Sequence, residues 1–68
     1  MINRDLFNKA LKDSGKSLAA VSGYLGINPS TLYRKITGIT DFSRNEIILM
    51  KDCLGLSEND LYAIFFDH

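Results

Sequence analysis

Five positions in this chain can each begin a helix, and successive ones lie only 11 to 15 residues apart. They carry asparagine or serine, whose side chains cap helices by accepting a hydrogen bond from a backbone amide of the first turn. These positions are Asn3, Ser17, Asn28, Ser43 and Ser57. Glycine follows four of the five segments, where it can end a helix. This spacing predicts a series of short helices.

Apolar residues recur at helical spacing within these segments. The predicted inward-facing sets are Leu6, Phe7, Ala10 and Leu11, then Leu18, Val21 and Leu25, then Leu32 and Ile36, then Ile47, Met50 and Leu54, and finally Leu61, Ile64 and Phe65. Ser43 with Glu46 predicts a capping box, and Ser57 with Asp60 repeats the pattern with a shorter carboxylate. No segment alternates apolar and polar residues long enough to indicate a strand. The predicted fold class is all-α.

The length of 68 residues fits one domain, 1–68, with no room for a deep substrate cavity. No apolar run approaches the roughly 20 residues of a membrane span, and no leader sequence opens the chain, so we expect a cytoplasmic protein without membrane contact. The single cysteine, Cys53, excludes a disulfide framework and is expected to be a buried thiol. No metal-ligand cluster, phosphate loop or acid-base constellation is visible, so we expect neither an enzyme nor a cofactor.

The charges are unevenly distributed along a chain whose net charge is zero. Residues 1–44 carry seven basic and three acidic side chains, a net charge of +4, whereas residues 45–68 carry one and five, a net charge of −4. This division indicates one surface for an anion and another for a different partner, although chance segregation of solvated charges gives the same pattern.

The segment from Ser17 to Gly38 has the pattern of a helix-turn-helix. Gly26 can form the tight turn, because glycine adopts positive φ at little cost. With Leu32 and Ile36 directed inward, the second helix, Pro29 to about Thr37, must present its polar side chains to solvent. These side chains are Ser30, Thr31, Tyr33, Arg34 and Thr37.

Three parts of this segment, Leu25-Gly26-Ile27, Ser30-Thr31-Leu32 and the terminal Gly38, resemble the Cro/CI-type (XRE) helix-turn-helix family of phage and bacterial repressors. The resemblance implies a five-helix lambda-repressor-like DNA-binding domain with the motif in its second and third helices. Lys35-Ile36-Thr37-Gly38 and Ile64-Phe65-Phe66 resemble small phage early regulators, which include Cro-like repressors and modulator-of-repression antirepressors. The implied function is transcription regulation in the lysis-lysogeny switch of a bacteriophage.

In this family the third helix enters the major groove of double-stranded operator DNA while neighbouring segments contact the backbone. The resemblance therefore implies base contacts from Ser30, Thr31, Tyr33 and Arg34. It implies phosphate contacts from Lys16, Ser17, Asn28, Lys35, Thr37, Thr40, Ser43 and Arg44. Because few of these residues are basic, we expect limited affinity unless two copies bind together.

The C-terminal segment is more apolar than one helix face requires, which leaves Tyr62 and Phe66 as candidates for a protein interface. One partner is a second copy, because paired operator half-sites are usually read by a two-fold dimer. The alternative is a CI-type repressor, to which this chain would bind as an antirepressor that blocks or alters DNA binding.

Overall fold

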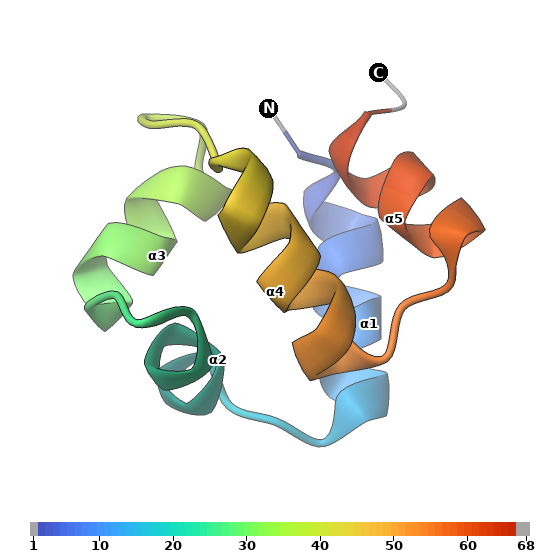
Figure 1. Ribbon diagram of the computed structural model, residues 1–68, viewed down its shortest axis with the longest axis horizontal. Helices are drawn as coiled ribbons and strands as arrows, with labels where there is room; N and C mark the ends of the chain where they lie inside the picture. Colours follow the sequence, from blue (N-terminus) through green and yellow to red (C-terminus); the bar gives the residue numbers. More distant parts are fainter. Residues whose placement is uncertain (1, 67–68) are drawn as a thin grey trace.

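The computed structural model describes residues 2–66 as five α-helices joined by short loops (Figure 1). The helices are α1 (Arg4–Ser14), α2 (Leu18–Leu25), α3 (Pro29–Ile36), α4 (Arg44–Leu54) and α5 (Glu58–Phe65). No strand occurs among these residues, so the prediction of an all-α fold is confirmed.

Four of the five predicted caps make the expected hydrogen bond. The side-chain oxygens of Asn3, Ser17 and Ser57 each accept from a backbone amide three residues later, at 3.1 Å. Ser43 and Glu46 form the complete capping box, with one bond in each direction. Asn28 begins α3 without a side-chain cap, and Pro29 in the first position has no amide hydrogen that needs one.

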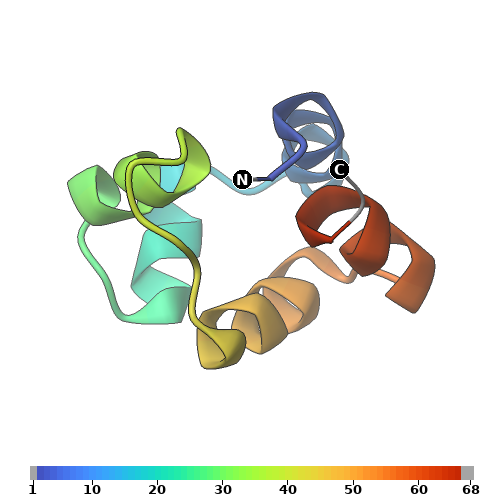
Figure 2. The ribbon, with the colours of Figure 1, turned by 90° about the horizontal axis from the view of Figure 1, so that it is seen from above.

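Two sets of helix contacts build the molecule. α2 packs against α3 and α4, whereas α1 packs against α4 and α5 (Figure 2). The amide of Asn3 also donates to the carbonyl oxygen of Ile64 at 2.7 Å, which joins the start of the described chain to its last helix. α4 is therefore the element shared by the half that contains α2 and α3 and by the half that contains α1 and α5.

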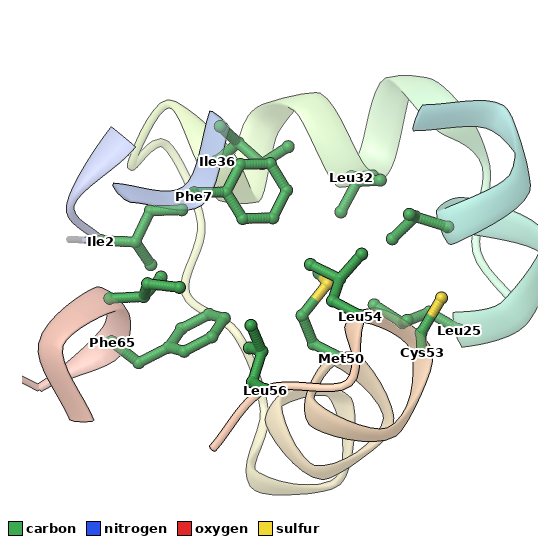
Figure 3. Close-up of a cluster of buried hydrophobic side chains, with 12 residues drawn as sticks. Ile2, Phe7, Leu25, Leu32, Ile36, Met50, Cys53, Leu54, Leu56 and Phe65 are labelled. Carbon is green, nitrogen blue, oxygen red and sulfur yellow. The ribbon is translucent and has the colours of Figure 1, made fainter. Parts of the chain in front are cut away.

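The core lies between α3 on one side and α4 on the other, and is closed at one end by Phe65 (Figure 3). Leu32 and Ile36 from α3 point towards Met50 and Leu54 from α4 across this space. Phe7, Val21, Leu32 and Met50 are the largest fully buried side chains. Their inward positions match the predicted apolar pattern.

The prediction is wrong for two leucines at the edge of the core. Leu18 and Leu6 are each 38% exposed. Leu18 is the first residue of α2, so its side chain lies at the rim. Leu6 precedes the buried Phe7 by one residue, and neighbours in an α-helix point about 100° apart, so both cannot occupy the same interior position.

Candidate nucleic-acid interface

The turn between α2 and α3 is tightly hydrogen-bonded. Gly26 has φ +74°, and its amide donates to the carbonyl of Gly23 at 3.2 Å. The amide of Ile27 donates to the carbonyl of Ser22 at 3.0 Å, which completes the last turn of α2. These bonds place the start of α3 directly after α2, with Gly26 in the turn as predicted.

The two helices of the motif are fixed by their buried side chains. Those side chains are Val21, Leu25, Leu32 and Ile36. Ser22 is the only polar side chain buried among the described residues, and its hydroxyl donates to the carbonyl of Ala19 at 2.8 Å. Since no polar atom is left without a partner there, the two helices can approach closely at that point.

The outward face of α3 carries the four predicted base-contacting residues. Ser30, Tyr33 and Arg34 are exposed, Tyr33 by 57%, and Thr31 is half-buried. A guanidinium nitrogen of Arg34, Nη2, lies 3.4 Å from Thr31 Oγ1 and donates to it. This contact directs the charged group along the helix towards its N-terminal end.

Lys35 differs from the expectation that its ammonium group contacts DNA. Nζ of Lys35 lies 3.0 Å from Oε1 of Glu46 and donates to the carbonyl oxygen of Asp41 at 2.9 Å. Both side chains of this ion pair are only 14% exposed. The ammonium group is thus used to hold the loop after α3 against the start of α4.

The carboxylate of Glu46 is stabilised in its charged form. Its burial acts to raise the pKa, but hydrogen bonds from Ser43 and Lys35 and the positive charge of Lys35 outweigh this effect and lower the pKa below 4.5. Oε1 of Glu46 accepts the amide of Ser43 at 2.8 Å. The N-terminal end of α4, where Ser43 was expected to meet a phosphate, therefore already holds an anion of its own.

Thr37 also makes its hydrogen bonds within the protein. Its hydroxyl lies 3.0 Å from the carbonyl of Tyr33 and 3.2 Å from that of Arg34, so it can donate to either. The residue is half-buried at the end of α3. A phosphate contact from Thr37 would have to use the remaining lone pairs, which do not attract an anion.

The remaining predicted phosphate contacts are exposed. They are Lys16, Ser17, Asn28, Thr40 and Arg44. In Figure 1, α3 lies at the left edge of the molecule, with α2 below it and the loop that leads to α4 above it. The segments that carry these residues are thus distributed on both sides of α3.

Ile39 was not among the predicted site residues, yet it is the most exposed of the large apolar side chains, at 70%. Its amide donates to the carbonyl of Arg34 at 2.9 Å, which ties it to the end of α3. The available signal was its position between Gly38 and Thr40, outside every helical apolar pattern. Together with Tyr33 it adds apolar surface next to the polar face of α3.

The two predicted protein-interface residues lie within α5 and directly after it. Tyr62 and Phe66 are both more than half exposed, and their ring centroids are 6.3 Å apart. Phe65, in the same helix as Tyr62, is buried and meets the Phe42 ring edge-on, with the ring centroids 5.4 Å apart. The division into one core aromatic and two exposed ones follows the prediction.

Residues 2–66 contain one cysteine and several acidic side chains that could take part in other kinds of site. No group of three potential metal ligands occurs there, and Cys53 is buried and unpaired. None of the helices described is both long and apolar enough to cross a bilayer. No family model, curated protein or solved structure matches the chain.

Proposed function

We propose that this chain is a phage-type transcriptional regulator with a lambda-repressor-like domain that binds operator DNA through α2 and α3. The observation that supports the proposal is that α3 has one buried side and one exposed side. Leu32 and Ile36 anchor one side in the core, whereas Ser30, Tyr33 and Arg34 are exposed on the other. A helix held in this way can enter the major groove, whose width accepts an α-helix.

Arg34 is the residue best suited to sequence discrimination. Its guanidinium group can donate two parallel hydrogen bonds to O6 and N7 of guanine, which is worth roughly 1 to 3 kcal/mol against a wrong base. The contact with Thr31 favours a direction for the side chain before DNA arrives, so less side-chain freedom is lost on binding.

The segments on both sides of α3 supply the backbone contacts in this proposal. Lys16 and Ser17 lie at the start of α2, where backbone amides and the helix dipole favour an anion. Asn28 is exposed, and its side-chain NH2 group can donate to a phosphate. These contacts would set the register of α3 without reading sequence.

The proposal is tested by a gel-shift titration with the DNA that flanks the gene, at two salt concentrations. We expect a sequence-specific complex that weakens at the higher salt. Replacing Arg34 by alanine should lower affinity for the specific site by about 5- to 150-fold, the equivalent of one lost base contact. Arg4→Ala is the matched control, since Arg4 is an exposed arginine on α1, outside the motif.

Equal affinity of the wild type and the Arg34→Ala variant for the specific site would contradict base reading by α3. An equal loss in the Arg4→Ala variant would show that the effect is one of total charge. The affinities of the Arg34→Ala and Arg4→Ala variants together decide whether Arg34 contacts a base in the major groove.

An antirepressor is the second candidate function, and the exposed apolar side chains favour it. Ile39 and Tyr33 beside the face of α3, and Tyr62 and Phe66 on α5, offer surface that DNA phosphates do not need. The same titration tests this candidate when a CI-type repressor is added. Absence of a shift by this chain alone, with loss of the repressor's own shift, would establish it.

A further inference from the structure

The solvent-facing side of α4 carries a stripe of three residues with a charge at each end. Arg44, Ile48 and Asp52 are spaced four residues apart, so they lie along one face of the helix. All three are exposed, Ile48 by 50%. Along the helix the stripe therefore consists of a positive charge, an apolar side chain and a negative charge.

Both charges of the stripe lack a partner within the described chain. The single ion pair among residues 2–66 joins Lys35 to Glu46, and neither Arg44 nor Asp52 takes part in a side-chain hydrogen bond there. A single exposed isoleucine is common on protein surfaces, but here it lies between two opposite charges that have no partner among residues 2–66.

The stripe borders an apolar groove between α4 and α5. This groove has a volume of about 560 Å³. It is lined by Phe42, Arg44, Ile47, Ile48, Leu61 and Phe66. Arg44 and Ile48 thus belong to both features, and the half-exposed ring of Phe66 extends the apolar area beyond the stripe.

We propose that this surface binds a second copy of the chain across a two-fold axis near Ile48. A two-fold contact is self-complementary, so the same patch must match itself when turned by 180°. With two α4 helices antiparallel, Ile48 meets Ile48 of the second copy, and Arg44 of each meets Asp52 of the other. On each helix these charges lie about 6 Å from the crossing point, a distance that four residues of α-helix span.

This arrangement explains why the occupant is a copy of the same chain. When the stripe of one copy is turned end to end against that of another, each positive charge faces a negative charge. Both Arg44–Asp52 pairs can therefore form in the same dimer. A groove for an unrelated protein has no need for this internal symmetry. The proposal assigns Arg44 to the subunit contact, in place of a DNA phosphate.

The test uses the full chain without DNA, so its result is independent of whether the chain binds an operator. Sedimentation equilibrium would measure association of the wild type and of two variants, Arg44→Asp and Asp52→Arg. Each variant places two like-charge contacts in its own dimer, and we expect association at least about tenfold weaker than in the wild type. Mixing the two variants should restore it, because a dimer of one with the other contains two opposite-charge pairs.

A matched control makes the same charge changes on another helix. Lys9→Asp and Asp13→Arg alter an exposed basic and an exposed acidic residue of α1, and we expect both to associate as the wild type does. Circular dichroism would verify that all four variants remain helical. A wild type that stays monomeric up to about 1 mM would overturn the proposal. So would a dimer that both stripe variants leave unchanged, or one that their mixture fails to restore.

Discussion

At the scale of single residues, Lys35 departs most clearly from what its position on α3 indicates. A lysine near the end of a recognition helix is expected to reach a phosphate, but here its ammonium group binds Glu46 and the carbonyl of Asp41. The positive charge is balanced inside the protein, so it would add less to the attraction of an anion to α3. The pair instead joins the loop after α3 to the capping box of α4.

Replacing Glu46 by glutamine should therefore lower stability at neutral pH by about 0.5 to 1 kcal/mol, because it removes the charge that Lys35 faces. Chemical denaturation measures this loss. Asp60→Asn is the control, since Asp60 holds the same third position in α5 without an ion pair among the described residues. A loss as large in the control would contradict a special role for the pair.

The same pair predicts a pH dependence. The pKa of Glu46 is lower in the folded chain than its ordinary value of 4.5, so the carboxylate stabilises the fold above pH 4.5 and loses this effect as the pH falls through the folded-state pKa. We expect the stability difference between the wild type and Glu46→Gln to shrink as the pH is lowered below 4.5. A difference that stays constant down to pH 3 would show that the charge of Glu46 is not its source.

At the scale of elements, the end of α2 decides how α3 is presented. Gly26 needs φ +74°, a conformation that costs other residues roughly 1 to 2 kcal/mol, whereas Gly23 lies within α2 and has open space around it. The two glycines are three residues apart and both are exposed, yet they have opposite requirements.

The same substitution at these two glycines should thus have opposite effects. Gly26→Ala should destabilise the fold by about 1 to 2 kcal/mol, because alanine is strained at positive φ. Gly23→Ala should stabilise it by about 0.5 to 1 kcal/mol, because alanine is the better helix former. Thermal unfolding of both variants tests this pair, and a change of the same sign in both would contradict the turn geometry.

Much of the fold could be predicted because the local signals are strong. The asparagine and serine caps, the capping box at Ser43 and the glycines after the helices each depend on a few neighbouring residues, and they set the helix boundaries. The exposure of Leu18 and the pairing of Lys35 with Glu46 depend on how separate helices pack. Helical spacing carries no information on that packing, so these features could not be predicted from it.

The candidate site likewise has features that follow from the local sequence pattern and others that depend on how the helices pack. Which residues of α3 face outward follows from the buried Leu32 and Ile36 on its other side. The position of Ile39 outside every helical pattern was a signal of its exposure, whereas the lack of an ion-pair partner for Arg44 and Asp52 became apparent only from the folded arrangement. The base and phosphate contacts themselves remain predictions, because they require the DNA.

At the scale of the whole molecule, small size makes association important. A domain of 68 residues buries a modest part of its unfolded surface, so its own stability is limited. A partner that binds only the folded form adds to stability by mass action. Contacts through α4 would reinforce the element on which both halves of the domain pack.

The midpoint of thermal unfolding should for this reason rise with protein concentration, by roughly 3 °C for each tenfold increase. The Arg44→Asp variant should show little such rise, since its dimer is weakened. Scanning calorimetry at several concentrations measures both. A midpoint independent of concentration in the wild type would be the behaviour of a monomer.

The placement of α3 and α4 on opposite sides of the core has one more consequence (Figures 2 and 3). If two chains join through the outer face of α4, their α3 helices point away from each other, towards opposite ends of the pair. Such a pair cannot lie along one duplex and occupy neighbouring turns of the same groove. Its two α3 helices could instead reach two separate stretches of DNA.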